Sequence, residues 1–160
     1  MSDEPFVPEG FAVPDGLVAG ELRLTPLGPQ HNEADYAAWT ASMDHIRGTP
    51  GFPDGSWPRE MSLADNRRDL ERHARDFAGR RGFTYTVLSA GSGDVIGCVY
   101  IYPVRGGEPG GGEGGGRRRA SVQSWVRADC AALDPVLYDA VLAWLERDWP
   151  FDSIEYAPQT

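Results

Sequence analysis

The sequence predicts a single α/β domain in which strands and helices alternate along the chain. Residues 120–149 indicate a strand, a short loop and a long helix, and residues 83–102 indicate two strands joined by a glycine-containing turn. The chain has 160 residues, of which 41% are hydrophobic, and this is enough for one domain with its own core. Three prolines and three glycines among residues 1–20 predict an extended N-terminal arm, which leaves residues 21–160 for the domain.

Charge and composition exclude several classes of function. The formal net charge of −9 disfavours nucleic acid as a partner. Cys98 and Cys130 are too few for a disulfide framework, so both are expected to be reduced thiols. The longest apolar run, residues 95–102, is too short to cross a membrane, and the acidic N-terminus lacks the features of a signal peptide. Metal-ligand spacings such as H-E-x-x-H or C-x-x-C do not occur, so we expect no metal and a cytoplasmic protein.

The first strand is predicted at residues 21–27, where leucines alternate with polar residues, and the first helix at residues 33–47. Asn32 is expected to cap this helix. Its inner face is expected to carry four apolar side chains, Tyr36, Trp39, Met43 and Ile46. His31 and His45 flank the helix and are expected to be solvated surface residues rather than ligands.

Residues 48–61 contain three prolines and three glycines, so no regular element is predicted there. The segment also carries Phe52 and Trp57, which a fully solvated loop does not need. Two interpretations stay open. Either these aromatic residues plug the core from outside, or together with Asp54 they form the wall of a substrate-binding pocket.

A second helix is predicted to begin at Ser62 and to end at Gly82, because Ser62 followed by Asp65 resembles a capping box. One face carries three apolar residues and two polar ones, namely Leu63, Asn66, Leu70, His73 and Phe77. The remaining faces mix arginine with acidic residues, as is typical of a solvated surface. His73 is expected to be a hydrogen-bonded histidine at the edge of the core rather than a catalyst.

Residues 83–88 and 95–102 are the two strands of a predicted hairpin, and residues 106–119 are predicted to be a flexible glycine-rich loop. This loop contains the pattern G-x-G-x-x-G. A dinucleotide site is nevertheless rejected, because a basic triplet and a strand follow the glycines where the motif requires a helix.

The last unit is predicted to comprise a strand at residues 120–126, a loop at 127–133, a helix to residue 149, and a short strand at 153–156. Asp134 is the expected N-cap of this helix and Pro135 its first residue. The N-terminus of such a helix can hold an anion.

This order of elements resembles the GNAT superfamily of acyl-CoA-dependent N-acyltransferases, most clearly in the run SWVRADCAALDPVLYDAVLAWL. The resemblance implies a central mixed, mostly antiparallel sheet flanked by about three helices. It also implies acetyl-CoA as the acyl donor, with the backbone of residues 125 and 126 aligning the pantetheine arm and residues 127–134 in the place of the pyrophosphate loop. The implied cofactor-binding residues are Trp125, Val126, Arg127, Ala131, Ala132 and Asp134.

This loop departs from the family pattern, Arg/Gln-x-x-Gly-x-Gly/Ala. It contains no glycine, Asp134 adds a negative charge where a diphosphate would lie, and Pro135 removes one N–H donor. For catalysis we expect Glu155 as the base, or one of four acidic or histidine residues near the acceptor side, Asp44, His45, Asp54 and Glu60. Tyr100 and Tyr102 are candidate acids, although packing explains both side chains better.

Two functions remain open from the sequence. The first is an N-acetyltransferase that moves an acetyl group from acetyl-CoA to a small-molecule or peptide amine. The second is a GNAT-like domain without catalysis that binds a ligand or a protein partner. An open sheet edge at residues 153–156 would favour a homodimer in the second case.

Overall fold

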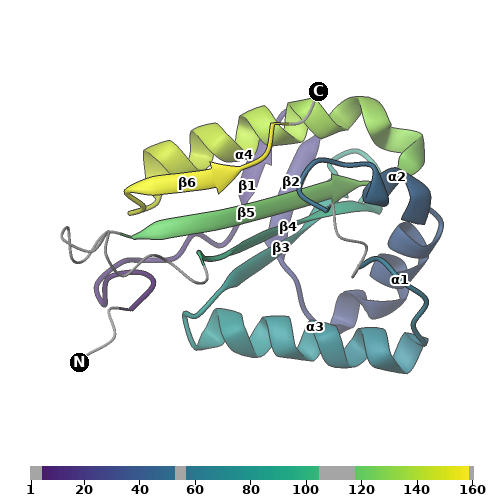
Figure 1. Ribbon diagram of the computed structural model, residues 1–160, viewed down its shortest axis with the longest axis horizontal. Coiled ribbons are helices and arrows are strands. Elements are labelled where there is room, and N and C mark those ends of the chain that lie inside the picture. Colours follow the sequence, from purple (N-terminus) through teal and green to yellow (C-terminus); the bar gives the residue numbers. More distant parts are fainter. Residues whose placement is uncertain (1–4, 53–56, 105–117, 159–160) are drawn as a thin grey trace.

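The computed structural model describes residues 5–52, 57–104 and 118–158 (Figure 1). Asp54 and most of the glycine-rich segment predicted at residues 106–119 lie outside the described residues. A six-stranded sheet runs through the structure in sequence order, with strands β1 Leu17–Ala19, β2 Leu22–Pro26, β3 Phe83–Ser89, β4 Val95–Pro103, β5 Arg119–Val126 and β6 Ser153–Tyr156. Neighbouring strands are antiparallel except for β5 and β6, which are parallel. The predicted mixed, mostly antiparallel sheet is confirmed.

Helices cover both faces of this sheet (Figure 1). On one face lie α1 Asn32–Thr40, α2 Met43–Arg47 and α3 Leu63–Ala78, and on the other lies α4 Asp134–Asp148. Two short 3₁₀ helices, Pro29–His31 and Ala128–Leu133, precede α1 and α4.

Each face of the sheet has its own hydrophobic cluster. Trp144 and Leu145 of α4 are buried against the strands, and the ring of Trp144 lies 5.2 Å from that of Tyr85. On the opposite face, Trp39 of α1 packs with Trp125 of β5. The alternation of side chains along a strand explains this division, since Trp125 and its neighbour Val126 point to opposite faces.

The single helix predicted at residues 33–47 is wrong, because the chain forms two helices separated by Ala41 and Ser42. Thr40 ends the first helix, and its hydroxyl donates to the carbonyl oxygen of Tyr36 at 2.7 Å, a local bond that competes with helix propagation. The N-cap position belongs to His31 rather than to Asn32. The amide of Asn32 instead donates to the Leu63 carbonyl at 3.2 Å.

The start of α3 confirms the predicted cap, since Ser62 Oγ accepts the Asp65 N–H at 3.0 Å. The helix ends at Ala78, earlier than the predicted Gly82, because Arg80 adopts a φ of 59°. A left-handed residue cannot continue a right-handed helix.

The N-terminal segment does more than lie across the surface. Its residues Leu17–Ala19 form β1, and Val7 is fully buried in the core. Arg80 holds this segment, because its guanidinium donates to the carbonyl oxygens of Pro8 at 2.6 Å and Phe11 at 3.0 Å.

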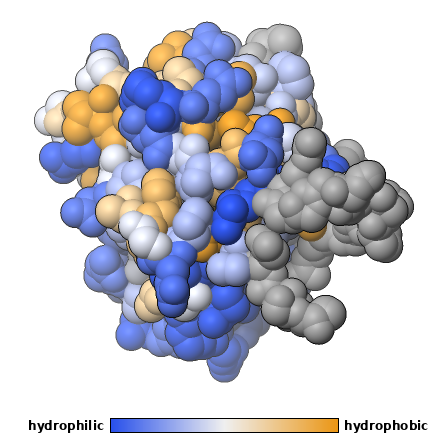
Figure 2. Space-filling model, turned by 90° about the vertical axis from the view of Figure 1, so that its left-hand side faces the viewer, coloured by the Kyte–Doolittle hydropathy of each residue, from blue (hydrophilic) through white to orange (hydrophobic). Residues whose placement is uncertain are grey.

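None of the described helices is long and apolar enough to cross a membrane. Figure 2 shows one face of the molecule, on which hydrophilic side chains predominate and hydrophobic ones lie between them in small patches. This face therefore does not present a large apolar surface.

Candidate functional site

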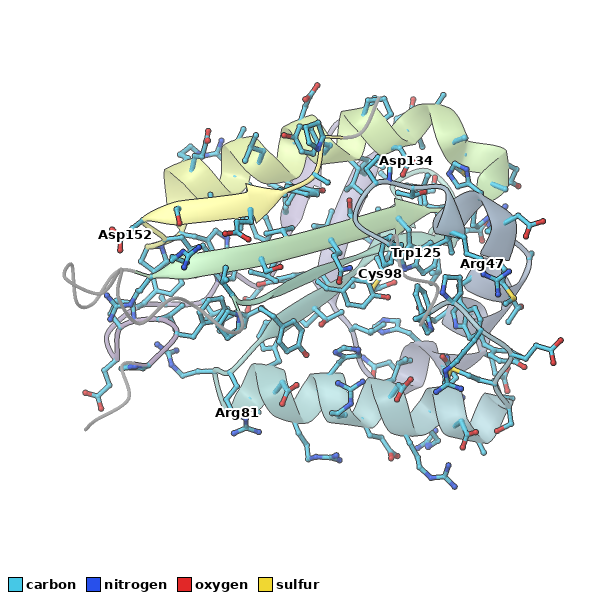
Figure 3. The ribbon with its side chains drawn as sticks, in the orientation of Figure 1. Arg47, Arg81, Cys98, Trp125, Asp134 and Asp152 are labelled. Carbon is cyan, nitrogen blue, oxygen red and sulfur yellow. The ribbon has the colours of Figure 1, made fainter. Side chains whose placement is uncertain are left out.

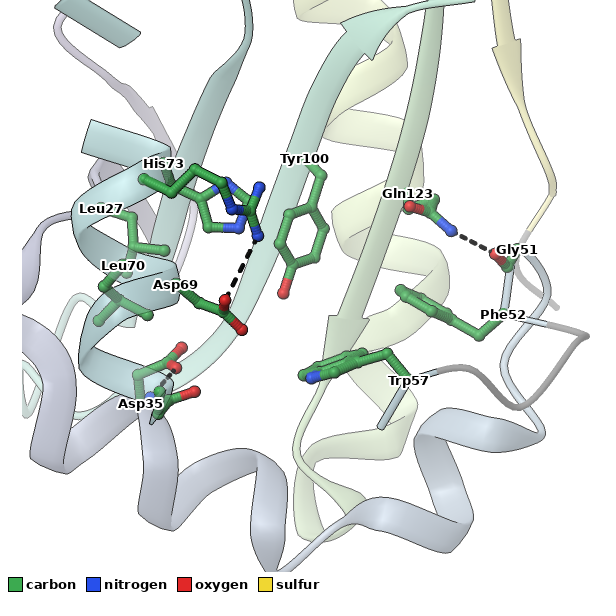
Figure 4. Close-up of a pocket in the computed structure, with 12 residues that line it drawn as sticks. Leu27, Asp35, Gly51, Phe52, Trp57, Asp69, Leu70, His73, Tyr100 and Gln123 are labelled. Atoms are coloured by element: carbon green, nitrogen blue, oxygen red, sulfur yellow. Dashed lines mark hydrogen bonds and ion pairs between the residues drawn. The ribbon is translucent and has the colours of Figure 1, made fainter. Parts of the chain in front are cut away.

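A cavity of about 450 Å³ lies between the sheet and helices α1 and α3 (Figure 4). The segment that precedes α3 forms one of its walls through Phe52 and Trp57, the two aromatic residues expected to bind substrate. The lining also includes seven polar and charged side chains, namely Asp35, Asn66, Asp69, Arg72, His73, Tyr100 and Gln123. Such a mixture of aromatic walls and a few polar groups is typical of a ligand site.

Trp57 is the centre of the aromatic wall. Its ring lies 5.2 Å from Trp39, 5.9 Å from Phe52 and 6.1 Å from Trp125, measured between centroids. Tyr100 lies opposite at 6.3 Å, so the cavity has aromatic rings on more than one side.

The floor of the cavity is a buried polar network centred on Asn66. Its amide nitrogen donates to Asp35 at 3.1 Å and to Asn32 at 2.9 Å, while its oxygen accepts the indole N–H of Trp39 at 3.0 Å. Burial raises the pKa of Asp35 to about 6, although the Asn66 bond opposes the rise. Asp35 forms no ion pair with any described residue, so at neutral pH an uncompensated negative charge lies in the cavity.

His73 forms the side of the cavity next to Tyr100, at a ring distance of 5.6 Å. Its Nδ1 lies 2.8 Å from the Tyr102 hydroxyl and 3.1 Å from the Thr84 hydroxyl. Burial, reinforced by the Arg72 guanidinium, lowers the pKa of His73 to about 4, so the ring is neutral at neutral pH. At the rim, Arg72 pairs with Asp69 at 3.5 Å (Figure 4).

The two candidate catalytic residues, Tyr100 and Glu155, both line a second cavity of about 750 Å³. His73 and Gln123 line this cavity as well as the first one. The Tyr100 hydroxyl accepts the indole N–H of Trp125 at 3.0 Å, and burial raises the pKa of Tyr100 well above its ordinary value. Glu155 lies on β6 and pairs with Arg119 at 2.9 Å. Tyr100 and Glu155 therefore share a cavity, although Glu155 lies outside the lining of the first one.

Several groups of the candidate cofactor loop, residues 127–134, form hydrogen bonds within the loop or with Ser42. The Arg127 guanidinium binds the Asp129 carboxylate through two bonds of 2.9 and 2.6 Å. The N–H of Ala128 donates to Ser42 Oγ at 2.8 Å, and that of Cys130 to the Arg127 carbonyl at 2.8 Å. Ala131 and Ala132 lie exposed on the 3₁₀ helix between β5 and α4.

Asp134 does not cap α4 as predicted, because it is the first helical residue and its carboxylate bonds elsewhere. Its Oδ2 lies 2.8 Å from Nε2 of His45, so the expectation that His45 is a solvated surface residue is also wrong. The carboxylate is buried at the start of α4 (Figure 3). Its Oδ1 has no hydrogen-bond partner among the described residues. Burial raises the pKa of Asp134, while the bond to His45 opposes the rise.

The sequence matches no protein-family model and no curated protein. Solved structures do match. One is a ribosomal-protein-S5-alanine acetyltransferase from Vibrio fischeri, with a TM-score of 0.58 and 10% identity over 81% of this chain. Another is the microcin C7 self-immunity acetyltransferase MccE in complex with acetyl-CoA and AMP, with a TM-score of 0.61 and 12% identity over 84%. A third is RimL, a ribosomal L7/L12 α-N-protein acetyltransferase, with a TM-score of 0.60 and 14% identity over 88%.

The chain has the GNAT fold. At identities of 10–14% the likeness concerns the fold alone. The chain spans 66% of the length of the first two structures and 70% of the third.

The GNAT fold implies CoA, and the residues present at the N-terminus of α4 do not fit its diphosphate. A buried carboxylate, Asp134, occupies the position at which the helix would hold an anion. Arg127 is already bound to Asp129, and the Ala128 N–H is already bound to Ser42. Next to this site, the hydroxyls of Ser124 on β5 and Tyr156 on β6 bond at 2.6 Å across the only parallel strand pair of the described sheet.

The sequence pattern did not identify Asp35, Asn66 or His73 as cavity residues. His73 was expected to be a hydrogen-bonded histidine at the edge of the core, on the same helix face as Asn66, and its Nδ1 does contact two hydroxyls. Asn66 and His73 are seven residues apart, on the face of α3 that carries Leu70. Two polar residues on an apolar stripe are the available signal for a cavity beneath the helix, because buried polar groups require partners. In the described part of the chain, no group of three or more His, Cys, Asp or Glu could hold a metal ion.

Proposed function

We propose that this GNAT-fold domain binds a small amine, free or at the end of a peptide, in the cavity between the sheet and helices α1 and α3. The observation that carries the proposal is the buried carboxylate of Asp35, which lines the cavity together with aromatic residues and forms no ion pair with any described residue. A buried carboxylate is stabilised by a bound cation, and the faces of Trp and Tyr rings attract ammonium groups. An ammonium ligand satisfies both requirements.

Acetyl transfer from acetyl-CoA to this amine is the second candidate. The fold favours it, because the matching structures are acetyltransferases and one of them contains acetyl-CoA. Tyr100 and Glu155, which both line the second cavity, are the candidate acid and base for that reaction. The residues at the start of α4 rank it below simple binding, because the buried Asp134 carboxylate lies at the helix N-terminus and Arg127 already pairs with Asp129.

Isothermal titration of the whole chain with phenethylamine, with 2-phenylethanol and with acetyl-CoA at low salt tests both candidates. We expect saturable binding of phenethylamine, weaker binding of the uncharged alcohol, and no saturable binding of acetyl-CoA up to millimolar concentration. Asp35→Asn removes the buried charge and is expected to weaken phenethylamine binding at least about tenfold, equivalent to about 1.4 kcal/mol. Asp139→Asn, which removes an exposed charge on α4, is the matched control and is expected to bind like the parent.

Equal binding of amine and alcohol, or an unaffected Asp35→Asn variant, would refute the amine proposal. Saturable binding of acetyl-CoA, followed by the release of free CoA when the amine is added, would establish the second candidate in place of the first. Mass spectrometry of the same mixtures detects the acetylated amine.

A further inference from the structure

The hydrogen bonds around His73 determine which of its two ring nitrogens carries the proton. The Tyr102 hydroxyl has one hydrogen, and it donates this hydrogen to Oδ2 of Asp76 at 2.9 Å. Asp76 also pairs with Arg81 at 3.5 Å, as a carboxylate does. The 2.8 Å contact between Tyr102 and Nδ1 of His73 is therefore a bond in which Nδ1–H donates to the phenol oxygen.

A neutral imidazole has a single N–H, so Nε2 of His73 keeps a free lone pair. Burial keeps the ring in this neutral form, since it lowers the pKa of His73 to about 4. Nε2 forms no hydrogen bond with any described residue. It is also not one of the described side-chain polar atoms that are both buried and without a hydrogen-bond partner. His73 lines both cavities, and Nε2 is the ring nitrogen that has no partner among the described residues.

We infer that His73 presents an unprotonated Nε2 to the cavity as the hydrogen-bond acceptor for a ligand N–H, and that Tyr102 and Asp76 are the positioning residues that hold this tautomer. The inference deepens the proposed function, on which its ligand part rests. It narrows the ligand class to ammonium groups that carry at least one N–H, which are those of protonated primary, secondary and tertiary amines. A quaternary ammonium carries the same charge and satisfies Asp35 and the aromatic wall, but it has no N–H to donate.

Tyr102 itself is fixed by the backbone beneath it. A Cβ at Gly82 would collide with the ring of Tyr102, so glycine is required at that position for the ring to lie where it does. Thr84, the other neighbour of Nδ1, does not select a tautomer, because a hydroxyl both donates and accepts.

Nitrogen NMR of protein labelled with ¹⁵N-histidine tests the tautomer without any ligand. We expect His73 to show a protonated Nδ1 and an unprotonated Nε2. His31 is an internal reference of the opposite kind, because its Nδ1 accepts the N–H of Gly28 at 3.1 Å and its proton therefore lies on Nε2. His73→Gln assigns the signals. Tyr102→Phe, which removes only the phenol oxygen, is expected to give a mixture of tautomers at His73. Tyr36→Phe, which removes a hydroxyl bonded to Met61, is the matched control and leaves the pattern unchanged.

The ligand part is tested by titration with phenethylamine and with its trimethylammonium analogue. His73→Phe is expected to weaken phenethylamine binding about tenfold and to leave binding of the trimethylammonium analogue unchanged, whereas His73→Gln, whose amide oxygen can accept, restores part of the loss. A protonated Nε2 in the free protein, an unaltered tautomer in Tyr102→Phe, or an equal loss for both ligands would overturn the inference. If neither ligand binds the parent protein, the proposed function fails, and the tautomer in the free protein still decides the inference about His73.

Discussion

Replacement of Asp35 by Asn is expected to make the folded protein more stable at neutral pH while it weakens ligand binding. The Asp35 side chain is buried, with 3% of its surface exposed. It forms no ion pair with any described residue, and the nearby Arg72 pairs with Asp69 instead. Asn has nearly the same shape, and its side-chain oxygen can still accept from Asn66, so the buried network survives. The substitution removes a charge that the folded state holds at a cost.

The size of the effect follows from the pKa. Burial raises the pKa of Asp35 from 3.8 to about 6, and this rise is equivalent to about 3 kcal/mol of unfavourable ionisation in the folded state. Because the folded state binds the proton more tightly than the unfolded state, the penalty is absent below about pH 4 and complete above about pH 7. The parent protein therefore loses stability relative to Asp35→Asn as the pH rises through this window. We expect a gap of about 1–3 kcal/mol at pH 8 and little gap near pH 4.

Urea unfolding followed by tryptophan fluorescence, repeated from about pH 4 to about pH 8, measures this gap. Asp139→Asn serves again as the control, since loss of an exposed charge is expected to change stability by less than about 0.5 kcal/mol. A parent protein that is as stable as Asp35→Asn at pH 8, or a gap that does not depend on pH, would show that burial does not raise the pKa of Asp35 above its ordinary value.

Three further substitutions test the framework around the site. Leu145→Ala is expected to cost about 2–5 kcal/mol in urea unfolding, because Leu145 is fully buried under the sheet; a loss below about 0.5 kcal/mol would contradict that placement. Gly97→Ala places a Cβ against the backbone carbonyl of Trp125, so we expect β4 and β5 to separate locally, with a loss of about 1–3 kcal/mol and a change in tryptophan fluorescence. Arg80→Ala frees the N-terminal segment, and limited proteolysis is expected to cut that segment faster than in the parent; an unchanged cleavage rate would show that apolar contacts alone hold it.

The sequence predicted most of the sheet because each strand carries a local signal. The alternation in β2, the apolar runs of β3 and β4 and the glycine-containing turn between them all lie within a few residues of one another. β1 was not predicted, since its three residues are stabilised by pairing with β2 rather than by any pattern of their own. The break between α1 and α2 was missed for a related reason. Ser42 lies between the two helices, where its Oγ accepts the N–H of Ala128. Because Ala128 lies far along the chain, this bond leaves no local pattern in the sequence.

The candidate site was predicted only in part. Phe52 and Trp57 were identified because aromatic residues are conspicuous in a segment rich in proline and glycine. Asp35 was not identified, since a carboxylate on a helix is ordinarily solvated, and His73 was expected to be a hydrogen-bonded residue at the edge of the core rather than part of a cavity. Their burial depends on helices α1 and α3 packing on the same face of the sheet. Asp134 was recognised as unfavourable to a diphosphate, but its bond to His45 depends on the position of α2 and could not be predicted locally.

The N-terminal segment and the segment after α4 meet in one stack of rings, and this has a consequence for how the protein folds. Trp149 contacts Phe11 and Phe83 at 5.5 and 5.3 Å, while Phe6 stacks on Phe151 at 4.9 Å. Contacts so distant in sequence close slowly, because the intervening chain must be ordered first. During synthesis, the aromatic side chains of the N-terminal segment thus stay uncovered until the segment after α4 has been made.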